Sequence, residues 1–229
     1  MRGFILGDFD SLASGCRVTS PPAVSLTARA TTDVEVAGGE GIITRTTGWS
    51  PRTLSIGLLA PSLDVVEHLA GTATHSGLYL RLSHLPGRYL ITTKGSVSEL
   101  SRFGTRWKAT LEVTCRPFTY LDAGLTPVPL RAGGVVRVVN PTLLDSRPVI
   151  TLSGSGTTTI TINNTPYRVV LPGSGELVID CGSMTCTVSG KTLTDALLAL
   201  DFPVLVPGVN TLALPAGVSG RLIPMWRTP

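Results

Sequence analysis

The chain has 229 residues, of which 42% are apolar, 15% are charged and 5% are aromatic, and its formal net charge is +4. So few charges exclude disorder driven by charge repulsion, and the scarcity of Glu and Lys beside abundant Thr, Val and Gly excludes a long coiled coil. The 25 Gly and 17 Pro predict many turns, in a chain long enough for one large domain or two of ordinary size.

No run approaches the roughly 18 apolar residues of a membrane span, so we expect no membrane insertion. Met1–Asp8 has a short apolar stretch followed by an acid, which is not the pattern of a signal peptide. We therefore expect a soluble protein that is made and folded inside a cell. The basic residues are dispersed, and the closest group is Arg102, Arg106 and Lys108, so solvated strand faces explain them better than a DNA groove does.

The first half reads as strands separated by turn residues. Arg52–Leu58 alternates polar and apolar residues, which is the period of a half-buried strand. Turns are expected at Gly38–Gly41 and at His84–Gly87. The expected strands are Ala23–Arg29, Asp33–Val36, Gly41–Arg45, Arg52–Ala60, Gly77–Ser83, Arg88–Lys94, Ser96–Leu100 and Thr105–Arg116.

One short helix interrupts these strands. Pro61 and the N-cap residue Ser62 precede Leu63–Ala70, and Gly71 closes the helix. Its apolar residues share one face, so the helix should lie across a sheet and depend on that packing. The residues expected on this face are Leu63, Val66, Leu69 and Ala70.

The clearest alternation in the chain lies in Thr105–Arg116. One face is apolar and predicted to lie in a core, while the other is polar and predicted to be wet or to form an interface. The apolar face carries Trp107, Ala109, Leu111, Val113 and Cys115, and the polar face carries Arg106, Lys108, Thr110, Glu112 and Thr114.

A domain boundary is expected within Asp122–Pro129, because its Gly and Pro residues cannot continue a central strand. About eight short strands then follow in about a hundred residues, which predicts a two-sheet sandwich. The sequence thus predicts an all-β protein with one short helix, built as two antiparallel β-sandwich domains in series, residues 1–125 and 126–229. The second domain should contain strands at Gly134–Asn140, Arg147–Ser153, Gly156–Asn163, Tyr167–Leu171, Glu176–Cys181, Met184–Val188, Lys191–Thr194, Val209–Leu214 and Gly220–Trp226, and a helical turn at Asp195–Leu200.

The four cysteines predict neither a disulfide framework nor a metal site. Cys16 and Cys115 are far apart in sequence and suit small apolar core positions. Cys181 and Cys186 are placed to face each other across a hairpin, which leaves a disulfide open, but free thiols are the expected state in a reducing compartment. No histidine lies near them in the sequence to complete a zinc site.

The catalytic motifs are incomplete. Gly190–Thr192 resembles the end of a phosphate-binding loop, but Thr185 stands where that loop needs Gly. Gly154–Gly156 lacks the earlier glycine of a nucleophile elbow, so turn chemistry explains both places better. Asp64 and His68 could both bind a metal from one helix face, but no third ligand is evident. Asp8 and Asp10 could form a carboxylate pair, but they lie in the first dozen residues, which look flexible. We predict that the protein is not an enzyme and has no cofactor and no metal.

A series of different short motifs follows a definite order along nearly the whole chain. In the first half they are the glycine-rich opening Gly3–Asp8, the glycine turn Gly39–Gly41 followed by Arg45, the strand Arg52–Ile56, the single helix, the hairpin Tyr79–Tyr89 and the strand end Cys115–Tyr120. In the second half they are Asn140-Pro141, Arg147–Gly156, Ile160–Asn163, Leu177–Asp180 and Phe202–Asn210. The last of these, Phe-Pro-x-Leu-x-Pro-Gly-x-Asn, is the most specific.

On this ordered set the sequence resembles the distal tail proteins of long-tailed phages, and its second half resembles their galectin-like domain. Pro117–Tyr120 matches the family pattern, whereas Cys115-Arg116 and the short helix depart from it. The resemblance implies a structural protein of the virion tail tip, made in the host bacterial cytoplasm. The first domain would form a homohexameric ring that extends the tail tube and contacts the tail tube protein. The second would project as a docking platform for tail-tip hub and receptor-binding or fibre proteins, with DNA passing through the lumen only as cargo.

A closed ring needs two different, complementary faces on each subunit, and exposed strands supply such faces. We expect subunit contacts on the polar face of Thr105–Arg116 and on the hairpin Gly77–Lys94, and a monomer is the alternative. The candidate contact residues are Arg106, Lys108, Thr110, Glu112, Tyr79 and Arg88.

The galectin-like resemblance also leaves carbohydrate binding at the host surface as the alternative function. A sugar usually stacks on an exposed aromatic ring, and the candidates are Tyr167 and Trp226. The second domain has no histidine, and its few aromatic residues look like core residues. We therefore favour a protein-binding scaffold, because a fold alone does not confer sugar binding.

Overall fold

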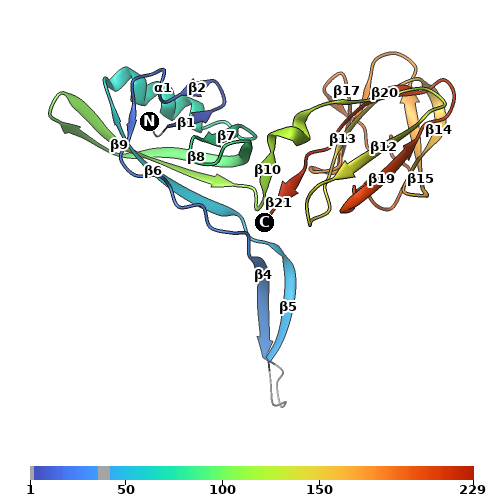
Figure 1. Ribbon diagram of the computed structural model, residues 1–229, viewed down its shortest axis with the longest axis horizontal. Helices are drawn as coiled ribbons and strands as arrows, with labels where there is room; N and C mark the ends of the chain where they lie inside the picture. Colours follow the sequence, from blue (N-terminus) through green and yellow to red (C-terminus); the bar gives the residue numbers. More distant parts are fainter. Residues whose placement is uncertain (1–2, 36–41) are drawn as a thin grey trace. The chain divides into compact units, whose positions relative to one another are not determined.

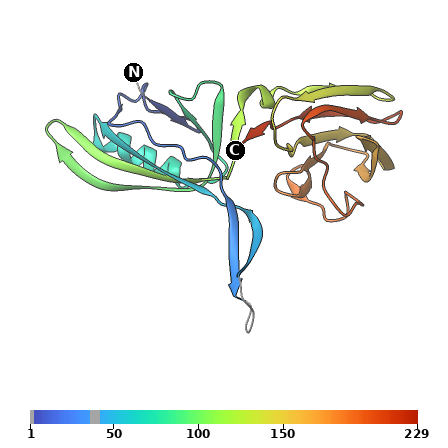
Figure 2. The same cartoon turned by 60° about the horizontal axis from the view of Figure 1, so that its bottom comes forward.

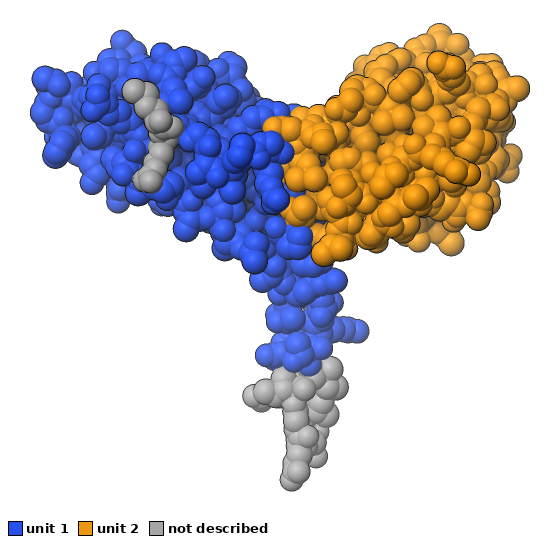
Figure 3. Space-filling view, viewed as in Figure 1, with its two compact units in different colours: residues 1–119, 229 blue, residues 120–228 orange. Residues whose placement is uncertain are grey.

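The computed structural model describes residues 3–35 and 42–229, so the expected turn at Gly38–Gly41 lies outside the described residues (Figure 1). The chain divides into two compact units (Figure 3). Unit 1 runs to Thr119 and also takes in the terminal Pro229, and unit 2 is Tyr120–Thr228. Both units are built from antiparallel strands, and the described residues contain one α-helix, so the predicted fold class is confirmed.

Seven strands of unit 1 form a continuous antiparallel sheet in the order β2-β1-β7-β8-β9-β6-β3. The long strand β8 joins the two halves of this sheet. Its first residues pair with β7, as in Leu80 with Leu90, and from Thr92 onward it pairs with β9. The bounds are β1 (Phe4–Leu6), β2 (Phe9–Asp10), β3 (Arg17–Val18), β6 (Arg52–Ala60), β7 (Tyr79–Leu82), β8 (Arg88–Phe103) and β9 (Arg106–Cys115).

The sequence predicted two strands, Arg88–Lys94 and Ser96–Leu100, where β8 is one strand that continues through Gly95. Gly95 instead lies where the end of the helix Leu63–Ala73 approaches the sheet closely. A Cβ built on it would lie 2.9 Å from the Ala73 carbonyl oxygen and 3.1 Å from Val113 Cγ1. Glycine is therefore required at this position by crowding and not by a turn.

The helix α1 (Leu63–Ala73) packs with β6, β8 and β9 around one core. It begins where the sequence predicted, after Ser62, although the Ser62 side chain makes no capping hydrogen bond. It ends later than predicted, because Gly71 continues the helix and its carbonyl oxygen accepts a hydrogen bond from the Thr74 amide. Val66 and Leu69 are buried as expected, and Leu63 and Ala70 are half-buried.

The core of unit 1 follows the alternation that the sequence shows. Ile56 of β6 pairs with Leu111 of β9, and Leu54 pairs with Val113, and all four side chains are buried. A fully buried leucine contributes about 2 kcal/mol of stability, so these central strands hold much of the unit together.

A separate two-stranded hairpin, β4 (Arg29–Glu35) with β5 (Ile42–Trp49), projects from the body of unit 1 (Figure 1, Figure 2). Its base is anchored by ring contact of Trp49 with Phe118, at 5.2 Å between centroids, and by Arg29, which lies 4.0 Å over the Trp49 ring. The strand predicted at Ala23–Arg29 was wrong. Side chains anchor this segment instead, because Arg52 donates to the Ser25 carbonyl oxygen.

Unit 2 is a sandwich of two antiparallel sheets around a single core. The six-stranded sheet has the order β11-β20-β13-β16-β17-β18, and the four-stranded sheet has the order β12-β19-β14-β15. The bounds are β11 (Val128–Leu130), β12 (Val135–Asn140), β13 (Val149–Ser153), β14 (Ser155–Ile162), β15 (Thr165–Pro172), β16 (Leu177–Asp180), β17 (Thr185–Val188), β18 (Lys191–Thr192), β19 (Gly208–Ala213) and β20 (Ser219–Ile223). The short strands β10 (Thr119–Leu121) and β21 (Arg227–Thr228) complete the list.

The helical turn predicted at Asp195–Leu200 was wrong. Within it, Ala196–Leu198 lies beside β15 and pairs with it. The Val170 amide donates to the Ala196 carbonyl oxygen, and the Leu198 amide donates to the Arg168 carbonyl oxygen. The backbone hydrogen bonds of this segment go to a strand that lies earlier in the chain.

The division between the units comes after Thr119, whereas the sequence prediction placed it after residue 125. The segment that follows Tyr120 is fastened to the end of the chain in unit 2. The Leu121 amide donates to the Trp226 carbonyl oxygen, and the Met225 amide donates to the Gly124 carbonyl oxygen. A Cβ on Gly124 would lie 2.4 Å from the Trp226 nitrogen, so this turn needs glycine.

Candidate interaction surfaces

The two glycine-containing motifs lie where strands begin, because Gly154 precedes β14 and Gly190 precedes β18. Gly154 and Gly190 have positive φ values of 156° and 79°, which suits turns beside strands. Asp10 caps its own turn, because its carboxylate accepts hydrogen bonds from the Leu12 and Ala13 amides. Among residues 3–35 and 42–229 there is no cluster of three or more His, Cys, Asp or Glu side chains placed to hold a metal ion. No helix in the same residues is long and apolar enough to cross a membrane.

All four cysteines are buried and free. Burial raises the pKa of the Cys115 thiol to about 12, against a smaller opposing effect of the Arg52 charge. Burial likewise raises the pKa of Cys181, and nearby Asp180 and Cys186 raise it further. These thiols are therefore core side chains that stay protonated at neutral pH.

The outward face of strands β6, β9 and β8 is lined with hydroxyl groups, and we call it the hydroxyl face. Glu112 lies between Ser55 and Ser96 in the register of the three strands. The Thr53 and Thr114 hydroxyl oxygens lie 3.5 Å apart on it. The exposed residues of this face are Thr53, Ser55, Ser96, Lys108 and Glu112, and Thr114 is half-buried.

Two of the predicted contact residues, Lys108 and Glu112, are exposed on the hydroxyl face. The expectation that Thr110 is exposed for a subunit contact is corrected, because its side chain is buried. Its hydroxyl donates to Glu99 Oε2 at 2.6 Å. Glu99 lies at a break in the pairing of β8 with β9 and has a φ of 56°, so its carboxylate folds back over the threonine. Arg106 is half-buried and donates to the Gly15 carbonyl oxygen at 3.1 Å.

The other two predicted contact residues, Tyr79 and Arg88, lie elsewhere on unit 1. The Tyr79 and Tyr89 rings are 4.7 Å apart, and the Arg81 guanidinium lies 5.8 Å and 5.5 Å from their centroids. Arg88 begins β8, while Lys108 pairs with Ser101 near the other end of that 16-residue strand. The structure therefore does not bring the six residues onto one surface.

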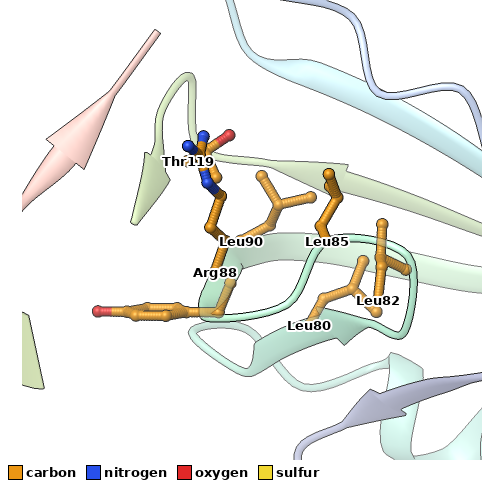
Figure 4. A pocket seen from close by; sticks show the side chains of 7 residues that line it. Leu80, Leu82, Leu85, Arg88, Leu90 and Thr119 are labelled. Carbon is orange, nitrogen blue, oxygen red and sulfur yellow. The ribbon is translucent and has the colours of Figure 1, made fainter. Parts of the chain in front are cut away.

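The hollow beside Arg88 is small and apolar (Figure 4). Its lining residues are Leu80, Leu82, Leu85, Arg88, Tyr89, Leu90 and Thr119. In the close-up the labelled leucines lie along it, and the polar groups of Arg88 and Thr119 lie near each other. It offers no space for a substrate, because its total empty volume is about 160 Å³, below the range of ordinary ligand sites.

The two residues predicted for a sugar site are not exposed aromatic platforms. Trp226 is 5% exposed and belongs to the core of unit 2, which corrects its place as a candidate. Tyr167 is half-buried and packs against the same core. Burial raises the pKa of its hydroxyl, and Cys181 and Asp201 raise it further.

The sequence prediction missed a group of exposed valines on the outer side of the four-stranded sheet, which we call the valine face. Val139 of β12 pairs directly with Val209 of β19, and these side chains are 60% and 63% exposed. Val135 is 68% exposed, and Arg137 lies between it and Val139 on the same face. The signal in the sequence was Val-Val-Arg-Val-Val-Asn, in which the polar residues are too few to cover an outer face.

No protein-family model and no curated protein matches the sequence. Among solved structures the chain is similar to SPP1 Dit, described as a paradigm of the hub adsorption apparatus of phages that infect Gram-positive bacteria. That match has 18% sequence identity, covers 97% of each chain and has a TM-score of 0.63.

Chains of the phage P2 baseplate in its activated conformation, solved with Ca and with Sr, are also similar. They match over 97% of both chains with 7% and 8% identity and TM-scores of 0.53. The fold is therefore that of phage hub and baseplate proteins, and the fold that the sequence resemblance implied is confirmed.

Proposed function

We propose that this protein is a structural component of a long-tailed phage tail tip, with the role of a distal tail protein in the virion. The observation that carries the proposal is the match to SPP1 Dit, which extends over 97% of both chains and so includes both units. A shared single domain is compatible with many functions, but the same two units in the same order are a more specific arrangement.

In this proposal unit 1 forms a homohexameric ring that joins the tail tube to the baseplate, and DNA passes through its lumen. The hydroxyl face suits a contact between subunits, because β9 is paired with a strand on each side and the face is rich in groups that donate and accept hydrogen bonds. Lys108 and Glu112 give it one positive and one negative charge. In a ring this face meets a different face of the next subunit, and the two charges can pair with opposite charges there. The hairpin of β4 and β5 supplies a second projecting element.

Unit 2 is proposed to hold other tail-tip proteins. Its exposed valines are the kind of surface that a protein partner covers. The alternative of sugar binding lacks an exposed aromatic ring at Trp226, so no observation in this unit favours it.

The ring is tested by mass photometry of the purified full chain over a range of concentrations. Particles with six times the mass of the 24.0 kDa chain, about 144 kDa, are expected. The double variant Lys108→Glu and Glu112→Lys should lower the hexamer fraction about tenfold, because both charges then face the wrong partner groups. The matched control is Arg131→Glu, which changes an exposed arginine of unit 2 and should leave the assembly unchanged.

A chain that stays monomeric at every concentration and also fails to bind isolated tail tubes would overturn the proposal. A hexamer that the double variant forms equally well would keep the ring but remove the hydroxyl face as its contact surface.

A further inference from the structure

Three of the four outer strands in the two sheets of unit 2 are protected against further strand pairing. In the six-stranded sheet, β11 has Pro129 at its centre, and β18 has only two residues, one of them Lys191. In the four-stranded sheet, the outer side of β15 is covered by Ala196–Leu198. Proline, charge, shortness and cover are the usual means by which proteins keep a strand edge from pairing.

The fourth outer strand, β12, has none of these protections. It is six residues long, pairs with β19 without a bulge, and contains four valines. Residues 120–228 are all described, and none of their strands pairs with its outer side. A regular apolar edge strand of this kind is a template for another strand.

The backbone groups on the open side of β12 belong to Val135, Arg137 and Val139. The Leu214 amide donates to the Gly134 carbonyl oxygen at 3.0 Å. Because hydrogen-bonded pairs alternate along an antiparallel ladder, the even-numbered residues of β12 bond to β19 and the odd-numbered ones point outward. The pairing of β19 with β14 supports this assignment. The Asn163 amide donates to the carbonyl oxygen of Thr211, so the odd-numbered residues of β19 bond to β14 and the even-numbered ones are left to bond to β12.

The side chains beside this open edge are apolar with a single cation among them. Val135 and Val139 are exposed on either side of Arg137. The four strands of this sheet contain no Asp or Glu, and Arg137 makes no ion pair within the described part of the chain. By contrast, Arg221 of the other sheet is paired with Glu176 at 2.8 Å.

A second copy of the same strand does not fit this edge. If two β12 strands paired antiparallel so that Val135 lay opposite Val139, Arg137 would lie opposite Arg137. Like charges directly opposite each other destabilise a strand pair. The arginine thus disfavours self-pairing in this register and favours a segment of opposite charge.

We propose that β12 binds an extended segment of another protein as an added strand, and that this segment has a carboxylate between two apolar residues spaced two positions on either side. Main-chain hydrogen bonds to Val135, Arg137 and Val139 would hold the segment, the valines would cover its apolar side chains, and Arg137 would pair with its carboxylate. That the segment comes from another tail-tip component rests on the proposed function. The strand pairing itself does not.

The test uses the full chain labelled with ¹⁵N and the blocked heptapeptide Thr-Val-Thr-Glu-Thr-Val-Thr. Addition of the peptide should shift the amide signals of Val135–Val139 and slow the hydrogen exchange of the amides of Val135, Arg137 and Val139. Half-saturation is expected on the order of 1 mM for so short a segment. The same peptide with Lys in place of Glu should bind about fivefold more weakly.

The Arg137→Glu variant should reverse this preference and bind the Lys peptide more tightly. The Arg137→Pro variant removes an outward amide without touching the bonds to β19, so it should lose peptide binding while it stays folded. The matched control is Arg168→Glu, an exposed arginine of β15 whose change should leave binding unaltered. No shift at 5 mM peptide, equal binding of both peptides, or shifts confined to other strands would overturn the proposal. None of these results bears on whether the chain forms a hexamer.

Discussion

The hydroxyl face of unit 1 and the valine face of unit 2 are both exposed sides of antiparallel sheets, yet they offer a partner different things. Strand β9 has a neighbour on each side, so its backbone groups are used and a partner meets side-chain hydroxyls and charges. Strand β12 has one neighbour, so a partner meets free backbone groups beside valines. The position of a strand within its sheet therefore decides the chemistry of the surface as much as its side chains do.

The largest expected effect comes from placing proline at an exposed charged residue of each strand. Glu112→Pro removes a ladder hydrogen bond in the middle of a sheet and should lower the free energy of unfolding by about 3 kcal/mol. Arg137→Pro should cost less than about 1 kcal/mol, because that amide points away from β19. Urea denaturation followed by circular dichroism measures both, with Glu112→Ala and Arg137→Ala as controls. Equal costs for the two prolines would remove the distinction between the strands.

The underside of the hydroxyl face offers the next test. Gly95→Ala places a Cβ 2.9 Å from the Ala73 carbonyl oxygen, and overpacking of this kind should cost about 2 kcal/mol. The matched change, Gly71→Ala, meets nothing within 4 Å inside α1 and should stabilise the protein by about 0.8 kcal/mol. Thermal unfolding of the two variants measures the difference. A neutral Gly95→Ala would show that α1 does not press on β8 as described.

A smaller effect tests the role of Arg137 at the open edge. Arg137→Thr removes the charge that keeps two β12 strands apart and should raise the constant for association through this edge about fivefold. Sedimentation velocity on the variant, the unchanged chain and Arg168→Thr measures it. If Arg137→Thr associates no more than Arg168→Thr does, then the arginine has no such protective role.

The last test concerns the inner side of β9. Because burial raises the pKa of Cys115 to about 12, the folded chain holds this proton more tightly than the unfolded chain does. Its contribution to stability is complete below the ordinary thiol pKa of 9.0 and is lost as the pH rises from there towards 12. Urea midpoints between pH 8 and pH 10.5 should fall more steeply for the unchanged chain than for Cys115→Ala. Parallel slopes would show that Cys115 titrates normally.

Much of the fold was readable from the sequence where burial of one strand face repeats with a period of two. The alternation in β6 and β9 predicted their buried apolar residues except for Trp107, which is half-buried, and the helix was placed correctly at its start. Prediction failed where the outcome depends on a distant partner. A helical turn was predicted at Asp195–Leu200, but that segment bonds to β15.

The candidate surfaces were predictable only in part, for the same reason. The polar side of β9 correctly gave Lys108 and Glu112 as exposed, but nothing local shows that Glu99 folds over Thr110. The strand β12 was predicted, but its partner β19 lies about 70 residues later, so the sequence did not show that its other side is open. Trp226 was a candidate only for the alternative function, and its burial agrees with the expectation that the aromatic residues of this domain belong to the core.

Electron microscopy of the purified full chain tests the central claim most directly. Averaged images should show closed six-fold rings formed by unit 1, with unit 2 projecting from them, and the same rings on tail tubes. Separate single chains, or open assemblies without six-fold symmetry, at every concentration and in the presence of tail tubes would contradict it.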